Sequence, residues 1–239
     1  MAKKPEIIAR YTVSLDELLQ KGGNLTAAAR RDLSLPNKGG LDDFGYTADQ
    51  LAVIEAAGEV VSEMPTDDEF VGVVTETTDL KDGLADQLRE QIDGLVARAI
   101  SFYGDASGKV RRYGADKLSK MTDGQLWQCA KRAVRVGKIQ LNDLKAKGLT
   151  QEYLNTLVST YTKFDAARDD QDDAIRERDI ATQERIMAAN AYYAQLQRLG
   201  ADGQAHFVAK DEARYNDYVW EPAPGEPSGG GETPVPPPK

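Results

Sequence analysis

Apolar residues recur every three or four positions along most of this chain, and this spacing restricts it to a fold of packed amphipathic helices. One buried stripe follows Thr47, a longer one with coiled-coil-like spacing follows Pro65, and a third runs from Thr150 to Leu196. Residues 71–75 could form a strand when taken alone, but their neighbours on both sides keep the helical spacing. The sequence therefore predicts an all-α protein, a multi-helix up-and-down bundle.

Capping residues and glycines indicate where these helices begin and end. Ser14, with Glu17 three residues later, is typical of a helix start. The Gly-Gly-Asn at 22–24 is expected to interrupt that helix, so that a second short helix begins near Leu25. Gly200 is expected to end the last long helix.

Two segments share the pattern Leu-x-x-x-Gly-(apolar)-Thr-x-(acid)-x-Leu, at residues 41–51 and 144–154. In each copy the glycine is expected to end one element in a left-handed conformation, and the threonine to cap the next helix. Two explanations fit: the chain contains two related helical units, or two helix starts converged on the same capping residues. The pattern resembles that of uncharacterised bacterial helical proteins, a resemblance that implies no function.

These features predict two similar helical units packed together, followed by a tail. The predicted ranges are 1–103 for the first unit, 104–121 for a connector, 122–200 for the second unit, 201–221 for an aromatic extension and 222–239 for an extended Pro/Gly-rich tail. The tail composition favours polyproline II and flexible chain, as in a tether. The alternative is a ligand for a proline-recognising partner, since two P-x-x-P matches are formed by Pro224, Pro227, Pro234 and Pro237.

Composition limits the partners of the chain. Its 30 Lys and Arg against 39 Asp and Glu give a net charge of -9, which repels nucleic acid and anionic lipid. No run of about 18 apolar residues occurs, so no membrane span is expected. No signal peptide is visible in the first residues. We therefore expect a cytoplasmic protein that does not bind nucleic acid and does not span a membrane.

One aspartate-rich stretch carries a possible metal motif. Asp169, Asp170 and Asp173 fit D-D-x-x-D, which is similar to the motif that holds Mg²⁺ against a diphosphate in all-α isoprenoid synthases. The resemblance implies an alternative function, a Mg-dependent diphosphate-binding all-α enzyme. A second acidic motif and nearby diphosphate-binding Arg and Lys are missing, and the charge-rich surroundings favour a solvated helix surface. No metal or cofactor is therefore expected.

Reactive side chains are few in this sequence. His206 is the single histidine, so the paired Glu-x-x-His motifs of a di-iron bundle cannot be built, and we expect it partly packed at the surface. Cys129 is the single cysteine, and although basic neighbours could activate its thiol, a buried structural thiol is favoured. No catalytic residue is predicted, and we expect a protein that is not an enzyme.

Charged and aromatic side chains indicate contacts with other proteins. Segment 109–138 is basic and includes Arg132 and Arg135, and we expect it to face the acidic stretch 165–179, within the fold or across a subunit contact. Trp220, in the aromatic extension, is a further candidate contact. Helical faces left over from the core can pair with one another. The favoured function is a non-enzymatic structural or interaction protein, a self-assembling helical-bundle subunit that is a homo-oligomer or binds a protein partner.

Overall fold

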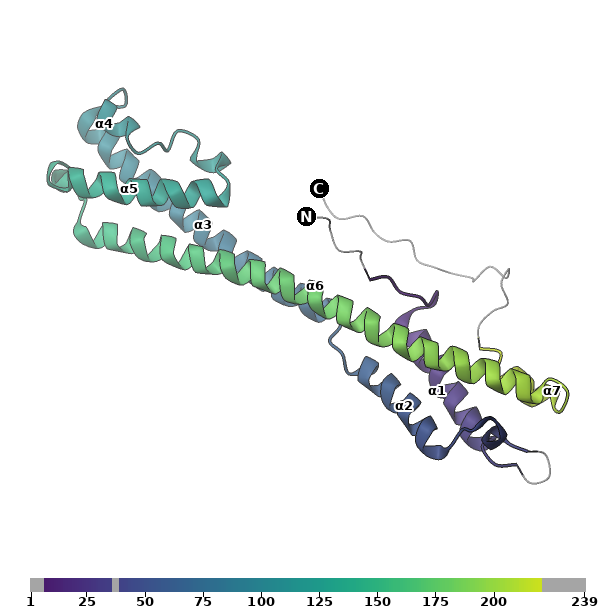
Figure 1. Ribbon diagram of the computed structural model, residues 1–239. Coiled ribbons are helices and arrows are strands. Elements are labelled where there is room, and N and C mark those ends of the chain that lie inside the picture. Colours follow the sequence, from purple (N-terminus) through teal and green to yellow (C-terminus); the bar gives the residue numbers. More distant parts are fainter. Residues whose placement is uncertain (1–6, 36–38, 221–239) are drawn as a thin grey trace, which may run out of the picture. The chain divides into compact units, whose positions relative to one another are not determined.

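The computed structural model of the chain describes residues 7–35 and 39–220, which contain helices and no strand (Figure 1). This confirms the predicted all-α class. Residues 71–75 lie inside helix α3 (Asp67–Tyr103), so their β-branched side chains do not override the helical pattern around them. Over the described ranges, no helix is both long and apolar enough to cross a membrane.

Contacts between residues divide the chain into two units. Unit 1 combines the described residues up to Met64 with those from Ala181 onward, and unit 2 spans Pro65–Ile180. Helix α6 (Gln151–Phe207) contributes its first part to unit 2 and its last part to unit 1. This division differs from the predicted ranges 1–103 and 122–200, because the apolar stripe of α3 shares one core with α5 (Asp123–Leu144).

Unit 1 is built from α1 (Leu15–Arg31), α2 (Ala48–Ser62), the last part of α6 and α7 (Glu212–Asp217). The Ser14 hydroxyl caps α1 by accepting a hydrogen bond from the backbone N–H of Glu17 at 3.2 Å. The core side chains include Leu18, Leu25, Leu51, Val61, Leu196 and Phe207. Each such side chain stabilises the fold by about 2 kcal/mol when it leaves water.

Unit 2 is built from α3, α4 (Gly108–Arg111), α5 and the first part of α6. Gly137 lies where α5 approaches α6, and a Cβ there would lie 2.8 Å from a methyl carbon of Leu154. The core side chains include Leu88, Ile92, Leu95, Leu126, Leu154 and Phe164. The α3 and α5 stripes therefore bury against each other and against α6.

The two copies of the capping pattern have the same local structure. In one, a 3₁₀ helix (Leu41–Phe44) ends at Gly45, whose φ is 81°. In the other, a 3₁₀ helix (Lys145–Lys147) ends at Gly148, whose φ is 76°. The next backbone N–H donates to the carbonyl of the first leucine of each pattern, at 3.3 Å from Tyr46 and 3.2 Å from Leu149. The predicted left-handed glycines are confirmed, while a duplication of whole units stays a prediction.

Two glycine positions that were expected to break helices lie inside them. Helix α1 runs through Gly22, where a Cβ would collide with the ring and hydroxyl of Tyr192. Helix α6 runs through Gly200, where a Cβ would lie 2.6 Å from Nε1 of Trp220. The expected breaks at 22–24 and at 200 are wrong, because these glycines make room for aromatic rings from other segments.

Candidate functional site

A buried hydrogen-bond pair fixes the segment that precedes α5. The Tyr113 side chain has no exposed surface, and its hydroxyl donates to Oε1 of Gln140 on α5 at 3.0 Å. Gln140 in turn donates from Nε2 to the Lys109 carbonyl at 3.1 Å. Burial raises the pKa of Tyr113 to about 12, so the hydroxyl keeps its proton and remains a donor. The predicted connector is thereby anchored along α5.

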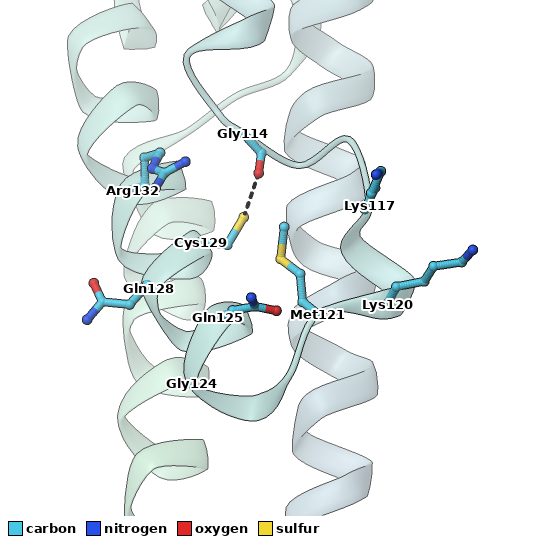
Figure 2. Close-up of a pocket in the computed structure, with 9 residues that line it drawn as sticks. All are labelled: Gly114, Lys117, Lys120, Met121, Gly124, Gln125, Gln128, Cys129 and Arg132. Atoms are coloured by element: carbon cyan, nitrogen blue, oxygen red, sulfur yellow. Dashed lines mark hydrogen bonds between the residues drawn. The ribbon is translucent and has the colours of Figure 1, made fainter.

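A pocket of about 440 Å³ lies between this segment and the first turns of α5 (Figure 2). Gly114 has a φ of 64°, and a Cβ there would collide with the Arg132 guanidinium. Helix α5 contributes positions one turn apart, so they share one face. The lining residues are Gly114, Lys117, Lys120, Met121, Gly124, Gln125, Gln128, Cys129 and Arg132.

The floor of the pocket carries the single cysteine. Cys129 is 2% exposed, and its Sγ lies 3.7 Å from the Gly114 carbonyl oxygen and 3.8 Å from that of Tyr113. Burial raises the pKa of the thiol, and nearby Arg132 opposes this shift only in part. The thiol is therefore neutral, which agrees with the predicted buried structural role.

Three cationic side chains surround the pocket opening. Lys117, Lys120 and Arg132 are exposed, and none of them forms an ion pair with another described residue. Figure 2 shows the Lys120 amine pointing away from the cavity, while the Arg132 guanidinium lies beside Gly114. No carboxylate lines the pocket. This part of the surface is positive although the chain as a whole carries a net charge of -9.

Arg132 also belongs to a larger basic surface on α5. We define the basic face as Arg132, Arg135 and Lys138, which are exposed and have no ion-pair partner among the described residues. Ile139 lies on the same side of the helix and is 76% exposed. The basic face therefore combines positive charge with one uncovered apolar side chain.

The aspartate-rich stretch lies on α6 and points into solvent. Asp169 and Asp170 are exposed, and adjacent positions on a helix point in different directions. Asp173 forms an ion pair with Arg176 at 2.6 Å, within the same helix. Over the described ranges, no group of three His, Cys, Asp or Glu side chains is placed to hold a metal ion. The three aspartates with the D-D-x-x-D spacing thus lie on an exposed surface of α6.

The basic and acidic segments do not pair with each other within the described chain. The acidic stretch uses arginines of α6, as in the pair of Asp165 with Arg168 at 3.3 Å. From the basic segment, Lys109 pairs with Asp143 at 3.1 Å. We define the acidic face as Asp169 and Asp172, which are three residues apart, exposed and without an ion-pair partner in the described structure.

The remaining predicted residues lie outside this site. Trp220 is half-buried, with its ring centroid 5.6 Å from that of Tyr193. His206 is 3% exposed and its Nε2 lies 3.1 Å from the Gly39 carbonyl oxygen, so the expectation of a surface position is wrong. It is buried because rings of Phe44 and Phe207 pack edge-on against it. The tail prolines lie outside the described residues: Pro224, Pro227, Pro234 and Pro237.

Sequence reasoning missed a buried carboxylate in unit 1. Asp32 has no exposed side-chain surface, and Arg214 lies 2.5 Å from it. A lone aspartate after a helix gives no sequence signal for such a contact, because its partner is far away in the chain. Within unit 1, Asp32 contacts Arg214 of α7 and the Tyr218 hydroxyl.

No model of a known protein family, no curated protein sequence and no solved structure matches the chain. The class of protein is therefore defined by the fold, an all-α protein of packed amphipathic helices.

Proposed function

We propose that this chain is a self-assembling helical interaction protein, in which the basic face of one copy binds the acidic face of a second copy. The observation that carries the proposal is that both faces belong to unit 2 and that neither has an ion-pair partner among the described residues. A second copy supplies the complementary charge to each face. In a two-fold dimer this contact forms twice, once in each direction. In a head-to-tail assembly it repeats from one copy to the next.

The charges set specificity more than affinity. Exposed ion pairs contribute about 0.2–1 kcal/mol each, so two or three pairs alone give weak association that falls as salt rises. Ile139, at 76% exposure beside Arg135, supplies apolar surface that leaves water in the contact. The proposal therefore predicts an interface with an apolar centre and charged surroundings.

The buried reactive groups are already engaged in packing, which favours an interaction role over catalysis. Cys129 contacts two carbonyl oxygens, His206 contacts the Gly39 carbonyl, and Asp32 is held by Arg214. The exposed charged faces, in contrast, have no such partner in the described chain.

Charge reversal tests the proposal. One variant combines Arg135→Glu with Lys138→Glu, and the other combines Asp169→Lys with Asp172→Lys. We expect each to lower self-association at least about tenfold, because like charges then face each other. Mixing the two variants should restore association, measured by light scattering during size-exclusion chromatography. Lys147→Glu, an exposed change outside both faces, is the matched control.

The same measurement separates this contact from an apolar one. Helix α2 exposes Val53 at 63% and Val60 at 58%, which lie on one side of the helix. Assembly that is abolished by Val60→Lys and unchanged by both charge reversals would contradict the proposed contact. A chain that is monomeric at every concentration and salt tested would contradict self-assembly itself.

A further inference from the structure

We propose that the pocket beside Cys129 binds a small organic anion with an apolar body, of the class of aromatic or aliphatic phosphate monoesters and carboxylates. Its volume of about 440 Å³ is in the range of small-molecule sites, about 300–1,000 Å³. The pocket lies between the 114–121 segment and α5 of a single copy (Figure 2), and it shares Arg132 with the basic face.

The inner surface of the pocket suits an apolar group. The Cys129 thiol is neutral because burial raises its pKa, and the Met121 side chain lies next to it in Figure 2. Gly124 forms part of the wall, and a Cβ there would meet no atom within 4 Å. An aromatic or branched aliphatic group can therefore occupy this space without displacing a side chain.

The opening of the pocket suits an anion. The Arg132 guanidinium is a planar fork that matches carboxylate and phosphate oxygens, and it has no ion-pair partner among the described residues. The left-handed Gly114, which has no Cβ, allows the guanidinium to lie against the backbone. Lys117 adds a second positive charge, and no carboxylate lines the pocket to compete.

The first turn of α5 is not the anion site. The Gln125 backbone N–H is already capped by the Thr122 hydroxyl at 3.4 Å, and the Gln125 side chain accepts from the Thr122 N–H at 3.0 Å. The proposed recognition therefore depends on the side chains of Arg132 and Lys117. This dependence makes it sensitive to single substitutions.

The test uses the full chain and phenyl phosphate as probe, titrated by isothermal calorimetry. We expect saturable binding to one site, with inorganic phosphate and benzyl alcohol each at least about tenfold weaker because each lacks one half of the recognised chemistry. Arg132→Gln should weaken phenyl phosphate about tenfold, and Lys117→Gln about two- to fivefold.

A cavity-filling variant gives the second readout. Gly124→Leu should abolish binding by occupying the pocket, whereas Gly83→Leu, at another helical glycine with open space around it, should leave binding unchanged. Circular dichroism confirms that both variants fold. Arg135→Glu, outside the pocket, should also leave binding unchanged, which separates this site from self-assembly. The proposal would be overturned if phenyl phosphate bound Gly124→Leu as tightly as the unmodified chain. It would also be overturned if the unmodified chain bound inorganic phosphate as tightly as phenyl phosphate.

Discussion

The Nη1 atom of Arg214 lies 2.5 Å from Oδ1 of Asp32, a carboxylate with no exposed side-chain surface. The Tyr218 hydroxyl donates to the other carboxylate oxygen at 3.2 Å, and Arg31 lies at 3.2 Å from both. A buried charge is tolerated only when it is paired and hydrogen-bonded, as Asp32 is here. The cluster joins the end of α1 to α7 within unit 1.

Loss of the Arg214 guanidinium should destabilise unit 1 strongly. Arg214→Gln leaves the Asp32 carboxylate buried with Arg31 and Tyr218 alone, and we expect the free energy of unfolding to fall by about 2–4 kcal/mol. Thermal unfolding followed by circular dichroism measures the change. Arg198→Gln is the control, because Arg198 is 84% exposed and pairs with Asp202 at 3.9 Å, and it should change stability by less than about 0.5 kcal/mol. Similar effects of the two variants would show that the buried pair contributes no more to stability than the exposed pair does.

Local capping patterns predicted the helix starts, since the atoms that decide a helix start are within a few residues of one another. Thr47 illustrates this, because its hydroxyl accepts from the Gln50 N–H at 3.2 Å within four residues of sequence. Tertiary contacts have no such local signal. Gly200 was predicted to end a helix because glycine often does so. The ring that requires this glycine, that of Trp220, comes from another segment and gives no local signal.

The candidate site was predictable only in part. Arg132 and Arg135 were identified from the basic composition of their segment, and both are exposed on α5. The pocket was not predicted, since it depends on the left-handed Gly114 and on how the connector is anchored through Tyr113. The expected pairing with the acidic stretch does not occur within the described chain, because Asp165 and Asp173 pair with arginines on their own helix.

Gly203→Ala should destabilise the chain although alanine favours helices. A Cβ at this position of α6 would collide with the ring of Tyr218, so α7 or the ring has to move, at a cost of about 1–3 kcal/mol. Gly83→Ala, in α3 with nothing within 4 Å of the new Cβ, should instead stabilise by up to about 1 kcal/mol. Urea unfolding of the two variants checks the opposite signs. Stabilisation by both would contradict the close contact at Gly203.

Stability should fall at alkaline pH in a way that depends on Tyr113. Burial, with a smaller contribution from Tyr103, raises the pKa of Tyr113 from 10.0 to about 12. Between these values the folded chain keeps the proton and the unfolded chain loses it, so the stabilisation is complete below pH 10 and is lost as pH rises through 12. Tyr113→Phe removes this contribution. Between these two pH values, the free energy of unfolding should fall by on the order of 2 kcal/mol less in the variant than in the unmodified chain. Urea unfolding at each pH measures this difference.

The baseline of this comparison needs its own control. Tyr113→Phe also removes the hydrogen bond to Gln140, which lowers stability by about 1 kcal/mol at every pH. The slope against pH, and not the absolute stability, therefore reports the ionisation. Equal slopes in both chains between pH 10 and pH 12 would show that Tyr113 ionises at its ordinary pKa.

The repeated left-handed glycines should respond alike to substitution. Gly45 and Gly148 have φ values of 81° and 76°, and a Cβ at either position would meet nothing within 4 Å, so strain arises from the backbone alone. Alanine should cost about 1–2 kcal/mol at each site, and asparagine less, because its side chain tolerates this conformation. Gly72→Ala, helical and equally open, should change stability in the opposite direction. A cost at one site and none at the other, measured by urea unfolding, would mean that the two patterns share sequence without sharing the same structural demand.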